Sequence, residues 1–207
     1  GLKQQIMAQD TIGQTNLSKV SMTIKSVLLY SLFFEGIGTV ILTLAWMQDY
    51  PFSDAFFYAA FYSVSAFNNG GFSLFPNSLM SFADQYLITL TISMLYIIGG
   101  IGFVVLMDIK RAKRWKKLSP NSKLILSTIA GLNFVAFLLI WAIEANNPHT
   151  LAAMSIGDQA LNAWFHATVP RSSGFNSLDV ASMQNSSTLL TMLLMFIGGG
   201  SLSTAGG

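Results

Sequence analysis

The chain has 207 residues, of which 52% are hydrophobic and only 10% are charged. Because soluble domains normally carry about 25% charged residues, this composition argues against a water-soluble protein and indicates a membrane protein. The formal net charge of +2 is too small to predict nucleic-acid binding. The absence of cysteine excludes disulfides, thiol nucleophiles and cysteine-based metal sites.

Residues 1–25 form a polar segment that precedes the first apolar stretch. They have neither the short apolar core nor the cleavage site of a signal peptide, and they do not begin with Met. We therefore interpret them as an internal cytoplasmic linker, and the chain as a fragment of a longer protein.

Three stretches are long and apolar enough to span a membrane, which takes roughly 20 helical residues for a hydrocarbon core about 30 Å thick. They cover residues 27–47, 86–107 and 124–143, and Glu35 is the one charged residue within them. A fourth stretch, 188–207, begins as TLLTMLLMFI and continues as GGGSLSTAGG. It predicts a helix that starts to span the membrane and breaks near its midplane.

The few charges orient these spans. Residues 1–25 carry three basic residues and the loop 108–120 carries six, so that with Lys123 ten of the eleven Lys and Arg share one side. The positive-inside rule makes that side cytoplasmic. The basic run 110–117 is explained by this topology signal, with contact to anionic lipid or to a cytoplasmic partner as the alternatives.

The outer connections, residues 48–85 and 144–187, are too apolar for ordinary loops. Residues 56–66 and 160–169 would form helices of about 16 and 15 Å, which reach only halfway through a bilayer. We predict two re-entrant half-helices, each followed by a non-helical string that contains glycine, FNNGGFSL and PRSSGFNSL.

These elements occur twice, at an offset of 103 residues that places Gly71 on Gly174 and Phe72 on Phe175. The predicted repeats cover residues 26–107 and 121–207, the second ending in the glycine-rich break. A half-helix entering from outside directs its negative C-terminal end at the membrane centre, which favours a cation. Glycine then allows backbone carbonyls to replace the ion's hydration shell.

The strings SAFNNGGFSL, PRSSGFNSLD and MFIGGGSLSTAGG, in this order, resemble the Trk/Ktr/HKT superfamily of potassium transporters, and most closely its Ktr-type membrane subunit. The resemblance implies an all-α membrane protein with four helix/pore-helix/helix repeats and re-entrant filter loops. This chain resembles the second and third repeats, half of a pseudo-fourfold pore. The resemblance also implies a homodimer in the bilayer on a cytoplasmic ring of nucleotide-binding regulatory subunits.

The same resemblance assigns potassium as the transported ion, sodium as a candidate coupling ion and no cofactor in this chain. The implied K⁺ ligands are filter carbonyls of Gly71 and Gly174 with Asn69, Gly70, Ser172 and Ser173. The implied gate is the intramembrane loop containing Gly198, Gly199, Gly200, Ser201, Ser203, Thr204, Gly206 and Gly207. The alternative for Gly71 and Gly174 is that they are ordinary turn glycines, and the alternative for the gate loop is close helix packing through small residues. Within the gate loop, Leu202 departs from the small residue that the resemblance implies at this position.

Four polar residues are candidates for filter support: Asn68, Arg171, Glu35 and Asn176. A carboxylate near the midplane is functional by default, but Glu35 also fits a structural tether to the pore-helix backbone or to Arg171. We hypothesise that Glu35 and Arg171 compensate each other. Asn68 and Asn69 are expected to brace the backbone, while Asn176 could do so or contact ions.

Other residues are assigned structural roles. Gly99, Gly100 and Gly102 are expected to serve helix packing rather than gating. His149 and His166, 17 residues apart, lack metal-ligand spacing.

The leading functional hypothesis is a potassium permease with a carbonyl-lined filter, a glycine-rich gate and control by a cytoplasmic partner. A non-conducting membrane scaffold is the alternative. A membrane-embedded enzyme would need a nucleophile, a metal cluster or paired carboxylates, which the sequence does not offer, so we predict that the chain is not an enzyme.

Overall fold

The computed structural model describes residues 17–171, 173–200 and 203–205, and all regular structure in these ranges is helical. The chain divides into two units, residues 1–34 and 35–207, at a point inside its first described helix. This helix, α2 (Leu17–Trp46), contains a candidate membrane span, Ile24–Trp46. It begins within the segment predicted as a linker.

The first repeat continues with α3 (Phe52–Phe67), η1 (Met80–Phe82) and α4 (Tyr86–Ile101). Helix α3 is longer than the predicted 56–66, but its 16 residues extend only about 24 Å. Trp46 and Tyr62, both fully buried, pack with Phe75 at the outer end of this repeat. The predicted half-helix is therefore present and anchored by aromatic side chains.

The second predicted span is not one straight helix. It is broken at Gly102, whose φ of 99° lies in a region that favours glycine. Helix α5 (Phe103–Ala112) leaves α4 at an angle of 92°. The prediction of a continuous span over 86–107 is wrong at its C-terminal end, and Gly102 forms this bend rather than a packing surface.

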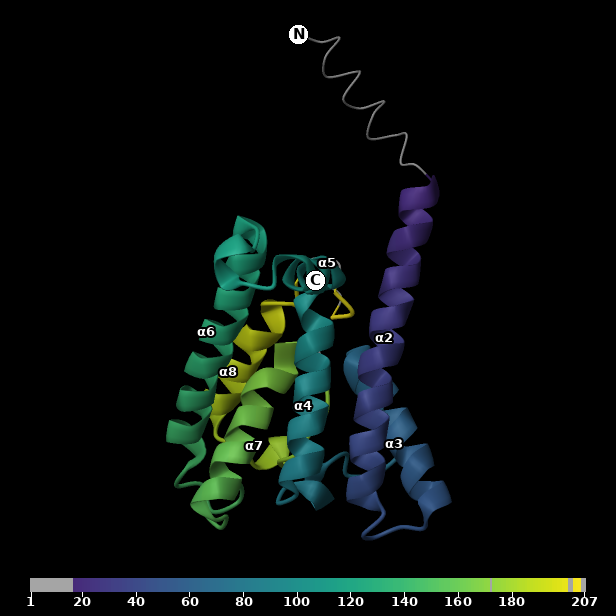
Figure 1. Ribbon diagram of the computed structural model, residues 1–207. Coiled ribbons are helices and arrows are strands. Elements are labelled where there is room, and N and C mark those ends of the chain that lie inside the picture. Colours follow the sequence, from purple (N-terminus) through teal and green to yellow (C-terminus); the bar gives the residue numbers. More distant parts are fainter. Residues whose placement is uncertain (1–16, 172, 201–202, 206–207) are drawn as a thin grey trace. The chain divides into compact units, whose positions relative to one another are not determined.

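After the short 3-10 turn η2 (Trp115–Lys117), the chain forms α6 (Pro120–Glu144), α7 (Ile156–Thr168) and α8 (Asn185–Phe196). The 3-10 turns η3 (Val169–Arg171) and η4 (Val180–Ser182) lie between α7 and α8. Ser119 and Ser155 cap α6 and α7, their hydroxyls accepting hydrogen bonds from the N–H groups of Ser122 and Asp158. Within residues 35–207, α4 lies between α3 and α7, and α6 packs on α7 (Figure 1).

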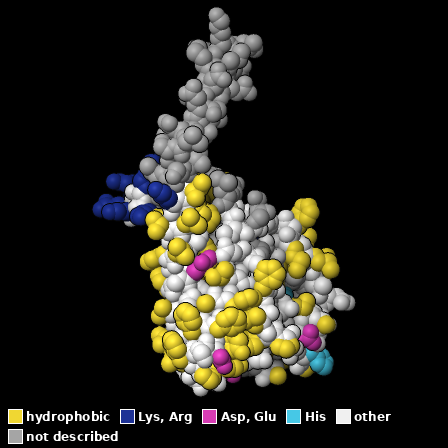
Figure 2. All heavy atoms as spheres, turned by 90° about the vertical axis from the view of Figure 1, so that its right-hand side faces the viewer, with side chains coloured by type: hydrophobic (Ala, Val, Ile, Leu, Met, Phe, Trp, Pro, Cys, Tyr) yellow, Lys and Arg dark blue, Asp and Glu magenta, His cyan; other side chains and the backbone are white. Residues whose placement is uncertain are grey.

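A small apolar core joins α6, α7 and α8 through Ala136, Ile140, Ala163 and Leu194. In contrast, large apolar side chains on the outer faces of α6 and α8 are exposed, with Phe196 94% exposed. Figure 2 shows apolar side chains spread over one face, with Lys and Arg gathered at its edge. Two described helices are long and apolar enough to span a membrane, or up to three if α4 and α5 count as one span.

Candidate functional site

The loop after α3 turns sharply away from the helix. Gly70 N–H donates to the Ser65 carbonyl at 2.8 Å, and Asn69 N–H to the Ala66 carbonyl at 3.0 Å. Asn69 and Gly71 have positive φ values of 54° and 67°. The Ser65 hydroxyl then holds the Phe72 carbonyl at 2.9 Å, which fixes the start of the returning segment.

The loop after α7 has a related geometry. Gly174 has a φ of 77°, close to the value at Gly71, its counterpart 103 residues earlier. Ser173 N–H donates to the Val169 carbonyl at 3.0 Å. Ser172, also predicted as a filter residue, lies outside the described residues.

The two loops meet. A Cβ atom on Gly71 would overlap the Ser173 carbonyl oxygen, and a Cβ on Gly174 would lie 3.8 Å from the Gly71 Cα. The returning segments are also hydrogen bonded, because Asn176 N–H donates to the Ser78 hydroxyl at 3.0 Å and its carbonyl accepts from Leu79 N–H at 2.9 Å. Both bonds use backbone atoms of residue 176, so the role of the Asn176 side chain stays a prediction.

The loop carbonyls are available to a ligand. Among the described residues, none donates a hydrogen bond to the carbonyls of Asn69, Gly70, Gly71, Ser173 or Gly174. Asn69 Oδ1 and Ser173 Oγ are buried and likewise have no partner in the described part of the chain. Oxygen atoms that are buried and receive no hydrogen bond can coordinate a cation, so this set of oxygens fits K⁺.

The glycine-rich segment after α8 packs against α4. Gly200 N–H donates to the Gly100 carbonyl at 2.8 Å, and Thr204 N–H to the Gly99 carbonyl at 3.3 Å. A Cβ on Gly99 would overlap the Phe67 carbonyl, and one on Gly200 would overlap that of Ile101. Gly99 and Gly100 thus lie in close contact with the glycine-rich segment, and their assignment to packing rather than gating stays a prediction.

Thr204 connects this segment to the loop after α3. Its hydroxyl donates to the Phe67 carbonyl at 2.8 Å and accepts from Asn69 Nδ2 at 2.7 Å. Of the predicted gate residues, Gly198, Gly199, Gly200, Ser203 and Thr204 are described. Ser201, Gly206 and Gly207, together with Leu202, lie outside the described residues.

Arg171 connects the second filter loop to the end of α8. Its guanidinium donates from Nη2 to the Gly198 carbonyl at 3.1 Å, from Nε to the Ile197 carbonyl at 3.4 Å and from Nη1 to Asn133 Oδ1 at 3.0 Å. A cavity of about 240 Å³ lies beside this contact, between α6 and Gly198–Gly200. Both loops thus hold the glycine-rich segment.

Glu35 is tethered to the end of α3. Its Oε1 accepts from Asn68 Nδ2 at 2.7 Å, and its carbonyl accepts from the Ser63 hydroxyl at 2.6 Å. Glu35 and Arg171 have separate hydrogen-bond partners among the described residues, and the hypothesised compensation between them stays a prediction. Asn68 Nδ2 also donates to the Val64 carbonyl at 3.0 Å, so these bonds tie Glu35 to the end of α3; support of a filter by either residue stays a prediction.

The sequence matches the TrkH family, described as cation transport protein, over residues 1–207. This chain belongs to the TrkH family. It is 41% identical to the Ktr system potassium uptake protein B of Bacillus subtilis and 37% identical to that of Vibrio alginolyticus, each alignment covering 100% of this chain and 46% of the relative. The chain therefore spans less than half the length of these relatives.

The crystal structure of the potassium transporter TrkH from Vibrio parahaemolyticus has the same fold, with a TM-score of 0.74 and 21% identity over 94% of this chain and 39% of that one. The expectations of an all-α membrane protein and of a transporter family rather than an enzyme family are confirmed.

The sequence did not single out two polar residues that organise this TrkH-family chain. The Tyr62 hydroxyl accepts from Leu74 N–H at 3.1 Å and from Phe75 N–H at 3.2 Å, while its ring stacks on Phe75 and Phe175. Tyr62 therefore holds both returning segments. Tyr58 and Tyr62 both lie in this aromatic helix, and no signal in the sequence separates their roles.

Glu144 is the second such residue. It is fully buried, and its carboxylate accepts hydrogen bonds from Gln184 N–H, Ser187, Thr150 and Asn147. It joins the end of α6 to the start of α8. In the sequence, Glu144 lies at the start of an outer connection, where an acidic residue is expected to be exposed, so its buried role was not predicted.

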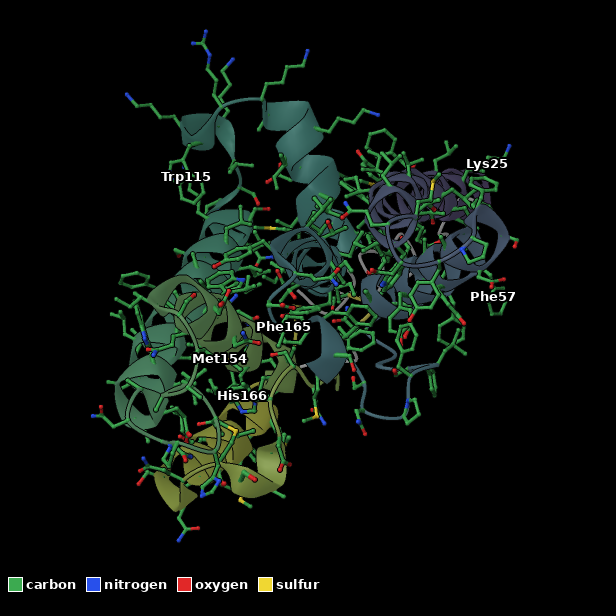
Figure 3. The ribbon with its side chains drawn as sticks, turned by 90° about the horizontal axis from the view of Figure 1, so that it is seen from below. Lys25, Phe57, Trp115, Met154, Phe165 and His166 are labelled. Carbon is green, nitrogen blue, oxygen red and sulfur yellow. The ribbon has the colours of Figure 1, made fainter. Side chains whose placement is uncertain are left out.

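The surroundings of His166 agree with the structural role expected of it, and the role of His149 stays a prediction. His166 is buried, and its Nε2 lies 3.1 Å from the Thr191 hydroxyl on α8. Figure 3 shows His166 directed toward α8, while the neighbouring Phe165 lies toward α4, where its ring contacts Tyr96. Among the described residues, no group of three or more His, Cys, Asp or Glu could hold a metal ion.

Removing the Tyr62 hydroxyl should destabilise the returning segments. In Tyr62→Phe the Leu74 N–H group loses its acceptor, while Phe75 N–H keeps the Ser73 hydroxyl at 3.1 Å. We expect the free energy of unfolding to fall by about 1–2 kcal/mol, measured as a lower Tm of the detergent-solubilised full-length protein. Tyr58→Phe is the matched control, because Tyr58 packs on Phe75 but its hydroxyl has no hydrogen bond among the described residues. Equal Tm values for the two variants would contradict the assignment.

The Glu35 tether predicts a difference between two substitutions. Glu35→Gln keeps an acceptor oxygen for Asn68, so we expect stability and transport near those of the parent protein. Glu35→Leu removes one acceptor from an exposed amide that still donates to the Val64 carbonyl, so we expect the free energy of unfolding to fall by about 1 kcal/mol. Loss of potassium uptake in a stable Glu35→Gln variant would show instead that the charge itself is required.

Proposed function

We propose that this chain supplies half of a potassium-selective pore, in which backbone carbonyls of Gly71 and Gly174, with those of Asn69, Gly70, Ser172 and Ser173, coordinate K⁺. The observation that carries the proposal is the meeting of two loops whose equivalent glycines share a left-handed conformation and whose carbonyls lack donors among the described residues. The names of the relatives, both potassium uptake proteins, support potassium as the ion.

The glycine-rich segment 198–207 is the proposed intramembrane gate. Its described part is held by hydrogen bonds from or to both filter loops, through Thr204 and Arg171. Three successive glycines, Gly198–Gly200, have too low a helix propensity to continue α8. The segment is therefore not held in a helix, and the bonds made by Thr204 and Arg171 can break without unfolding one. Release of the bonds would open the path beneath the filter.

The longer protein is proposed to work as a homodimer in the cell membrane with residues 1–25 and 108–120 on the cytoplasmic side. A cytoplasmic nucleotide-binding ring would bias the gate. In support, both relatives are named as one protein of a Ktr system, and Lys and Arg concentrate in the segments assigned to that side.

Uptake of rubidium, a potassium analogue, tests the function directly. The full-length protein containing this chain should restore uptake in cells that lack other potassium importers. A non-conducting scaffold would leave uptake at the background level although the protein is inserted in the membrane. Competition by potassium but not by sodium would identify the selected ion.

A further inference from the structure

We propose that the connection between α5 and α6 binds an anionic phospholipid, with its phosphate between Lys113 and Arg114 and an acyl chain along an adjacent apolar groove. This inference concerns the surface of the protein and does not rest on the proposed filter or gate. Membrane topology explains the basic run 110–117 without a ligand, and the proposal gives part of this run a specific ligand.

The backbone places this connection across the direction of the membrane spans. Helix α5 bends by 92° from α4 at Gly102 and is seen nearly end-on beside the tip of α4 in Figure 1. Val105, Ile109 and Ala112 lie on one face of α5 because their spacing is i, i+4 and i+7; Val105 and Ala112 are buried, whereas Ile109 is 39% exposed. A short amphipathic helix in this orientation is suited to the membrane interface.

The charge of the connection is strongly positive. Residues 108–117 contain six Lys and Arg and one acid, Asp108, which gives a local net charge of +5 (6 − 1). The Asp108 carboxylate accepts a hydrogen bond from Ser119 N–H at 2.9 Å, so it is engaged at the start of α6. An anion near Lys113 and Arg114 therefore meets little local repulsion.

A groove lies beside these two cations. It has a volume of about 280 Å³ and is lined by Ile109, Leu118 and Leu126 together with Lys113, Arg114 and Trp115. An apolar wall with cations and an indole at its rim matches a lipid, which presents a phosphate next to hydrocarbon. In Figure 3 Trp115 lies at the periphery, where the long basic side chains extend outward.

The surroundings favour a lipid over a soluble protein. Leu126 belongs to the candidate membrane span of α6, so the groove continues onto a surface that faces hydrocarbon. A soluble protein would have to compete with the bilayer for this apolar wall, whereas a lipid of the adjacent leaflet already occupies that environment.

The test uses the full-length protein reconstituted in phosphatidylcholine vesicles with and without phosphatidylglycerol. Brominated phosphatidylglycerol, but not brominated phosphatidylcholine at the same fraction, should quench Trp115 fluorescence, and Trp115→Phe identifies that part of the signal. Lys113→Asn with Arg114→Gln should weaken the quenching isotherm roughly 25-fold, or about fivefold per charge. The backbone φ of Lys113 is 54°, and Asn is chosen at this position because it tolerates a positive φ better than most residues.

The matched control is Lys116→Gln with Lys117→Gln, which removes the same charge from the same loop outside the groove. This variant should bind within a few-fold of the parent protein. Equal weakening in both pairs would show diffuse attraction without a site and overturn the proposal. Unchanged quenching in the Lys113/Arg114 variant, combined with loss of binding to the cytoplasmic regulatory subunit, would assign the surface to a protein partner instead. Unaltered Tm values establish that both variants fold.

Discussion

Gly71→Ala in the full-length protein should abolish the preference for potassium over sodium and lower potassium uptake at least about 10-fold. Alanine at a φ of 67° costs roughly 1–2 kcal/mol, and its Cβ would overlap the Ser173 carbonyl oxygen. To relieve that overlap, the Ser173 carbonyl, a proposed K⁺ ligand, would have to move. An increase of about 1.4 kcal/mol in the barrier to ion passage already lowers the rate tenfold. Rubidium uptake with sodium as competitor measures both effects.

Two further glycines make this prediction specific. A Cβ on Gly131, within α6, meets no atom within 4 Å, so Gly131→Ala should leave selectivity unchanged and stabilise the helix by up to about 1 kcal/mol. At Gly174 the φ is 77°, but an added Cβ would lie 3.8 Å from the nearest atom. Gly174→Ala should therefore strain the backbone without an overlap, and its loss of potassium uptake should be smaller than that of Gly71→Ala. Normal selectivity in stable Gly71→Ala protein would refute the carbonyl filter.

The sequence predicted features that local chemistry determines. Long apolar runs limit where spans can lie, and the change from apolar residues to Gly198–Gly200 placed the end of α8 to within a residue of Phe196. The internal repeat found Gly71 and Gly174 because both turns need a residue that tolerates positive φ. Each of these signals lies within a few neighbouring residues.

Other features depend on partners distant in the sequence. In the string IIGGIGF, Gly99 and Gly100 are helical while Gly102 forms the bend, and the first two pack against a segment about 100 residues later. Composition cannot distinguish three glycines so close together. Likewise, opposite charge suggested that Glu35 pairs with Arg171, whereas Asn68 and two backbone carbonyls provide better-placed partners.

Arg171 provides the second large prediction. Arg171→Gln cannot reproduce the guanidinium's hydrogen bonds to both the Ile197 and Gly198 carbonyls, and bonds from a charged donor contribute about 1.5–3 kcal/mol. Removal should therefore shift the gate toward the open state by roughly 10-fold to 100-fold. We expect higher rubidium flux through reconstituted full-length protein without its cytoplasmic partner.

A second variant separates the gate from general damage to the loop. Asn133→Leu removes the contact of Arg171 with α6 but leaves both carbonyl contacts with the glycine-rich segment. It should lower Tm with little change in flux without the partner, whereas Arg171→Gln should raise that flux. If both variants lower flux equally, Arg171 merely supports the loop after α7 and the gate assignment is contradicted. A rise in flux confined to Arg171→Gln requires that its bonds to residues 197 and 198 hold the gate closed.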